Sequence, residues 1–185
     1  TDKEFRKMLI DSGDDDLRGD LASTAEEETN DTLRTAILAI AETPKAIGKQ
    51  TAEQLIANPD NENNRKAFIE TLGLTRYVYT MLDRTDDFLL FNAAYQGEID
   101  KLPIERQMKV YTAIAGPRLL GEVMADDVVK AQGTPQADSI INNVNLRIHA
   151  LKKLYTPAEY EQMKEAFGRL ILTTDAAMTI SSFKF

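Results

Sequence analysis

Arginines close to aromatic side chains or helix breaks are the residues in this sequence best suited to bind a ligand. Arg84 follows Tyr79 by five positions, Arg118 comes directly after Pro117, and Arg147 lies beside an apolar helical stripe. A guanidinium held in place offers a fork of N–H donors that matches a carboxylate or phosphate. The sequence therefore predicts a small anionic ligand, and the predicted ligand-binding residues are Arg84, Arg118, Arg147 and Tyr79.

A structural role is the alternative for the same arginines. Arg118 and Arg147 could pair with internal acids such as Asp127 or Asp138. They could also lay their aliphatic stems on apolar surface while the charged group stays in water. In either case they would stabilise the fold rather than hold a ligand, and the sequence leaves both interpretations open.

Acidic clusters and the histidine are weaker candidates for chemistry. Residues 83–87 place acids three and four positions apart, a spacing that suits magnesium, although helix capping explains Asp86 and Asp87 more simply. Residues 58–69 lack the central glycine and final glutamate of a calcium loop. His149 could act as a general base, but the sequence contains no serine nucleophile in a glycine elbow. We therefore expect no catalytic residue, no metal and no cofactor.

Charge and composition exclude several classes of protein. The chain of 185 residues contains no cysteine, so disulfides and thiolate metal sites are excluded. Residues 11–31 hold nine acidic side chains and one basic one, which accounts for the whole net charge of −8. The remainder shows no basic face of the kind that nucleic acid requires. No run of about 18 apolar residues occurs, so we expect no membrane span within this chain.

Helical periodicity, interrupted by proline and glycine, predicts an all-α fold. We expect one domain over residues 1–185, with six to eight helices and an acidic, peripheral helical arm at residues 1–31. The aromatic-rich stretch 62–97 is predicted to be a buried central element, with a turn at residues 83–87. Residues 103–132 and 135–180 are expected to wrap it. The pattern of residues shows no repeat at a fixed period.

The function expected from these features is recognition without catalysis, because catalytic residue types are scarce. The specific expectation is an extracytoplasmic sensor domain of a bacterial receptor, a periplasmic or extracytoplasmic location being favoured over a cytoplasmic one. One alternative is a protein-interaction domain of a soluble effector, adaptor or assembly factor, with the acidic arm meeting a protein partner. A third is a small helical enzyme that uses magnesium on a phosphorylated substrate.

Overall fold

The computed structural model of the protein describes residues 23–24, 27, 31–41 and 43–185. These residues form helices and no strand, so the all-α prediction is confirmed. None of the described helices has the length and hydrophobicity needed to cross a membrane. The acidic arm predicted at residues 1–31 falls almost entirely outside the described residues. The helices are α3 (Asp31–Ala41), α4 (Pro44–Ala57), α5 (Glu62–Met81), α6 (Thr85–Asp100), α7 (Ile104–Ile114), α8 (Pro117–Ala131), α9 (Ala137–Leu154), α10 (Pro157–Leu172) and the 3-10 helix η1 (Asp175–Ser182).

Proline and threonine set several helix starts. α4, α8 and α10 each begin with a proline in the first turn, where the missing N–H costs no hydrogen bond. α10 also has a complete capping box, in which Thr156 and Glu159 each accept a hydrogen bond from the other's backbone N–H. The threonine–proline pair at residues 134–135 does not begin a helix in this way. Thr134 instead donates its hydroxyl to the Ala131 carbonyl within a turn, and α9 starts at Ala137.

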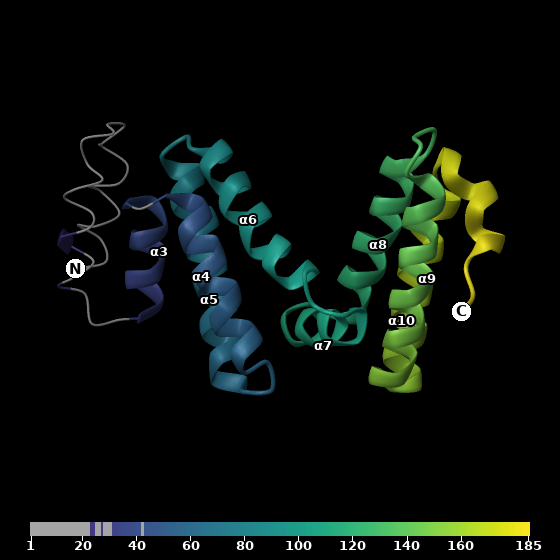
Figure 1. Cartoon of the computed structure of the whole chain (residues 1–185), viewed down its shortest axis with the longest axis horizontal. Helices are drawn as coiled ribbons and strands as arrows, with labels where there is room; N and C mark the ends of the chain where they lie inside the picture. The colour runs from purple at the N-terminus through teal and green to yellow at the C-terminus, as the bar shows by residue number, and fades with distance from the viewer. Residues whose placement is uncertain (1–22, 25–26, 28–30, 42) are drawn as a thin grey trace. The chain divides into compact units, whose positions relative to one another are not determined.

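The chain divides into two compact units, the first ending at Lys101 and the second covering Leu102–Phe185. In the first unit α4 packs on α6, and α3 packs on α5 (Figure 1). The predicted central element is broken by a turn in which Asp83 has a positive φ of 55°, as expected for the polar stretch. Its main packing partners are α3 and α4. The expectation that residues 103–132 and 135–180 wrap this element was therefore wrong.

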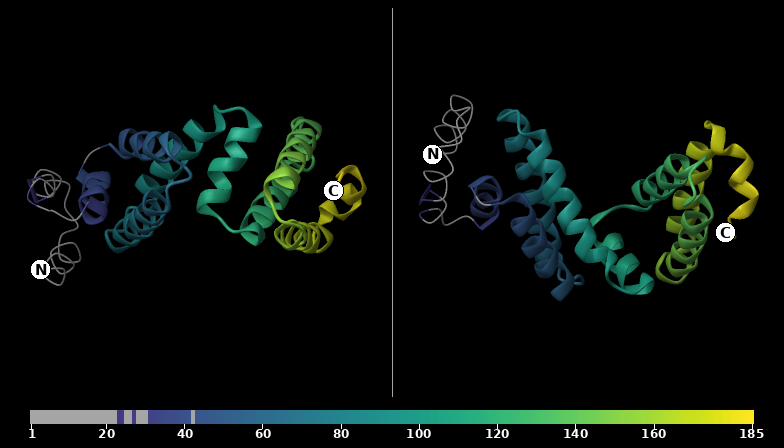
Figure 2. Two further views of the ribbon diagram at one scale, coloured as in Figure 1. Left: turned by 90° about the horizontal axis from the view of Figure 1, so that it is seen from below. Right: turned by 45° about the horizontal axis from the view of Figure 1, so that its top comes forward.

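Apolar side chains of the second unit form a core of their own. α8 packs on α10, α7 packs on α9, and η1 covers α10. Figure 2 shows α8–α10, coloured green to yellow-green, as one bundle in both views. Phe183, which follows η1, packs edge-on against Phe167 with 4.7 Å between ring centroids. The fully buried members of this core include Met124, Val128, Ile148, Leu151, Met163, Phe167 and Ile171.

The second unit repeats the helical plan of the first, which corrects the expectation that the chain contains no repeat. α7 and α8 begin 73 positions after α3 and α4, and α10 begins 72 positions after α6. Side chains in the packed interior recur at the same offsets. Buried positions that correspond are Ile47 and Leu120, Ala52 and Ala125, Leu55 and Val128, Val78 and Leu151, Phe91 and Met163, Tyr95 and Phe167, Ile99 and Ile171. Each unit is thus one copy of a four-helix plan.

A pair of glycines marks the same helix crossing in both units. A Cβ built on Gly48 would lie 2.4 Å from the Phe91 carbonyl oxygen, and one built on Gly121 would lie 2.3 Å from that of Met163. Real Cβ atoms do not approach a carbonyl this closely, so glycine is required for α4 to meet α6 and for α8 to meet α10. The repeat therefore extends to backbone packing.

Candidate ligand-binding pocket

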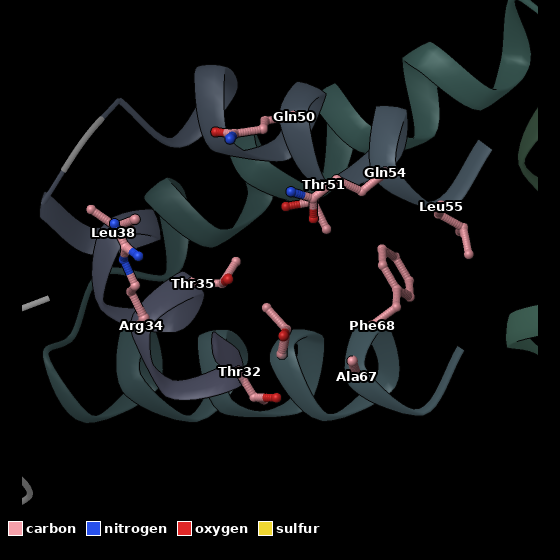
Figure 3. A pocket seen from close by; sticks show the side chains of 11 residues that line it. Thr32, Arg34, Thr35, Leu38, Gln50, Thr51, Gln54, Leu55, Ala67 and Phe68 are labelled. Atoms are coloured by element: carbon pink, nitrogen blue, oxygen red, sulfur yellow. The ribbon is translucent and has the colours of Figure 1, made fainter. Parts of the chain in front are cut away.

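A pocket of about 460 Å³ lies among α3, α4 and α5 of the first unit. Figure 3 shows Arg34 at one end and Phe68 at the other, with Thr35 and Thr51 between them. Its volume falls within the range of about 300–1,000 Å³ that is usual for small-molecule sites. The described residues that line it are Thr32, Arg34, Thr35, Leu38, Gln50, Thr51, Gln54, Leu55, Ala67, Phe68 and Thr71.

The repeat explains how this pocket arises. Positions equivalent to Thr35 and Thr51, 73 residues later, are Met108 and Met124, which are 1% and 2% exposed in the second core. A methionine side chain reaches two bonds further from the backbone than a threonine, so the shorter residue leaves space where the longer one packs. The first unit therefore has hydroxyl-lined space where the second has an apolar interior.

Two buried threonines give the pocket its polar character. Thr51 donates its hydroxyl to the Ile47 carbonyl at 2.7 Å, which leaves the oxygen lone pairs able to accept a hydrogen bond. Thr71 is 5% exposed and also lines the pocket. Its equivalent is Val144, which has the same shape and a methyl group in place of the hydroxyl. The Thr71 hydroxyl can donate and accept a hydrogen bond, so Thr71 is suited to bonding a ligand in the pocket.

The predicted ligand-binding residues of the first unit, Tyr79 and Arg84, do not line this pocket. Tyr79 is fully buried in α5 and donates its hydroxyl to the Ala39 carbonyl of α3. Its ring packs 6.3 Å from that of Phe88. Arg84 is the residue that immediately precedes α6 and is half-buried. The structure therefore gives Tyr79 a role in joining two helices.

The other two predicted arginines belong to the second unit. Arg118 is exposed, and its Nε lies 3.0 Å from a carboxylate oxygen of Glu122. Arg147 is largely buried and pairs at 3.8 Å with Asp127, one of the two acids that the structural alternative had named. The Arg147 Nε is buried without a hydrogen bond to any described residue. Two of the four predicted residues thus belong to each unit.

Sequence reasoning missed the pocket because it searched for charged and catalytic side chains. The informative signal was instead the placement of Thr51, Thr71 and Thr75 on buried helical positions, where a core helix normally carries apolar residues. The described part of the chain also brings together no group of three or more acidic or histidine side chains that could hold a metal ion. Asp86 and Asp87 lie in the first turn of α6, but the N-cap residue is Arg84 and no side chain caps the helix by a hydrogen bond.

A buried phenol in the second unit gives the stability of the fold a pH dependence. Burial, and secondly the Glu159 carboxylate, raise the pKa of Tyr155 well above its usual value. The folded state therefore keeps the proton that the unfolded phenol loses near pH 10, so stability falls as the pH rises above about 10.

Tyr155→Phe should match the wild-type protein at pH 7, since its hydroxyl has no partner among the described residues. Above pH 10 the variant should retain more of its stability. Urea unfolding at pH 7, 10 and 11 measures both effects. Equal losses in the two proteins would show that Tyr155 does not contribute to alkaline unfolding.

Comparison of the chain with protein-family models, with characterised proteins and with solved structures finds no match.

Proposed function

We propose that this protein is a recognition module that binds a small molecule in the α3–α5 pocket without converting it. The observation that carries the proposal is the contrast between the two units. Thr35, Thr51 and Thr71 line a pocket where the equivalent residues of the second unit, Met108, Met124 and Val144, form a packed interior. Threonines at these positions make the first unit less stable than packed apolar side chains would. A ligand-binding function would account for threonines at these positions despite that cost.

The chemistry of the lining supports binding rather than catalysis. General acid–base catalysis needs a group that gains and loses a proton near the working pH. The threonine and glutamine side chains of the lining have no such group. The described lining therefore supplies hydrogen bonds, one positive charge and apolar contact, which together suffice to hold and orient a molecule.

The specific form of this proposal is the extracytoplasmic sensor domain of a bacterial receptor. A ligand that contacts α3, α4 and α5 together favours the state in which these helices are packed, and differential binding of this kind is how a ligand shifts a conformational equilibrium. Sequence flanking this chain supplies a test. An apolar span of about 20 residues next to it supports a receptor.

Thr51→Met/Thr71→Val, which copies the residues of the second unit, tests pocket binding. In a thermal-shift screen of small organic acids, alcohols and amides, some compounds should stabilise the wild-type protein and not this variant. A compound at 100 times its dissociation constant stabilises by about 2.7 kcal/mol, which is readily measured. The variant itself should remain folded, because it restores a packing that the second unit already uses. Compounds that stabilise both proteins equally would contradict the proposal.

A further inference from the structure

We infer that the pocket takes a small organic monoanion, a carboxylate with an apolar body, whose charged group meets Arg34. This inference rests on the proposed function and adds the class of ligand. It follows from the charge of the lining, from the separation of its polar and apolar ends, and from the hydroxyl that Thr71 adds to the lining.

The described lining of the pocket carries a single positive charge. Among the described residues that line the pocket, Arg34 carries the one formal charge, and no acid accompanies it. No carboxylate in the described part of the chain forms an ion pair with Arg34. A guanidinium presents paired donors that fit a carboxylate, and one cation balances one negative charge. An anion of a single charge is therefore the best electrostatic match.

In the second unit, where the interior is packed, the position equivalent to Arg34 has a structural role. The equivalent of Arg34 is Gln107, which is 4% exposed and donates its side-chain amide to the Leu102 carbonyl at 2.8 Å. Gln107 thus has a structural role within its own unit. Arg34 replaces that neutral, internally bonded side chain with an exposed cation at the end of the pocket.

The other end of the pocket is apolar. Phe68 is 7% exposed and Leu55 is 2% exposed, and both lie at the end away from Arg34 in the view of Figure 3. Thr71 follows Phe68 by three positions on α5, so the two side chains share a helix face. A ligand with its carboxylate at Arg34 can place an apolar chain or ring against Phe68. A polar atom between these two ends of the ligand can form a hydrogen bond with Thr71. Burial of that body supplies the non-directional part of the affinity.

Hexanoate and hexanamide are suitable probes because they share size and apolar chain and differ in charge. Isothermal titration of the full chain should show hexanoate binding at least tenfold more tightly than hexanamide. Arg34→Gln, which copies the second unit, should weaken hexanoate at least tenfold and leave hexanamide unchanged. Arg118→Gln is the matched control, since Arg118 is an exposed arginine paired with Glu122, and it should leave both affinities unchanged.

Three outcomes separate this inference from the function on which it rests. If hexanoate and hexanamide bind with equal affinity and Arg34→Gln changes neither affinity, the inference of an anionic ligand is wrong. The pocket would then remain a site for neutral ligands. Binding of hexanoate that Arg34→Gln weakens and Thr51→Met/Thr71→Val abolishes supports both claims. No binding of hexanoate at 10 mM, on the order of the weakest affinity that titration measures, overturns the anionic class, and the thermal-shift screen then decides on the pocket itself.

Discussion

Gly121→Ala is expected to destabilise the protein, although alanine normally favours a helix over glycine. The new Cβ would lie 2.3 Å from the Met163 carbonyl oxygen, and a backbone atom has no rotamer by which to move away. α8 and α10 must then separate, and overpacking of this kind costs about 1–3 kcal/mol or more. Gly48→Ala should behave in the same way, because its Cβ would meet the Phe91 carbonyl oxygen at 2.4 Å. Chemical denaturation measures both losses.

Gly73→Ala is the matched control for this prediction. Gly73 also lies inside a helix, α5, but nothing lies within 4 Å of the Cβ that alanine would add. The substitution should therefore stabilise the protein by about 0.5–1 kcal/mol through helix propensity alone. A gain in stability for Gly121→Ala as well would show that α8 and α10 do not approach as closely as described.

Met124→Thr and Thr51→Met are expected to change stability in opposite directions, although they exchange the same two residue types at equivalent positions. Met124 is 2% exposed in the second core, so its loss should cost about 2–5 kcal/mol, as large-to-small core substitutions do. Thr51 faces the pocket, so methionine there has space to enter and should add about 0.5–2 kcal/mol.

Unfolding free energies of the two single variants and the wild-type protein measure this asymmetry. Because the two sites lie in different units, their effects should add in the double variant. A loss of stability in Thr51→Met comparable to that of Met124→Thr would mean that the first unit is packed like the second. The interpretation of the α3–α5 space as a binding pocket would then be wrong.

Local signals in the sequence predict much of the fold. Proline in the first turn and the pair Thr156 and Glu159 locate helix starts because capping depends on neighbouring residues only. The turn around Asp83 is predicted for the same reason, since polar residues interrupt two apolar stretches. Packing partners depend on contacts between distant residues, which is why the helices around α5 were assigned wrongly.

The repeat and the pocket could not be predicted from the sequence because they also depend on contacts between distant residues. Between α4 and α8 the residues that stay identical include Pro44 and Pro117, Gly48 and Gly121, and Ala52 and Ala125. These types are common in any helical protein, and their significance emerges once both glycines are seen against a neighbouring helix. A threonine in a helix does not by itself indicate a pocket. Thr71 becomes informative when its equivalent is known to be a buried valine.

Mapping of bound organic probes by amide NMR tests most directly whether the first unit holds a site that the second lacks. Shifts should be followed on titration with small probes of different charge, namely acetate, acetamide and 2-propanol. The account predicts perturbed amides around Thr35, Thr51 and Thr71, and unperturbed amides around Met108, Met124 and Val144. Equal perturbation at both sets of positions, or shifts confined to the second unit, would contradict it.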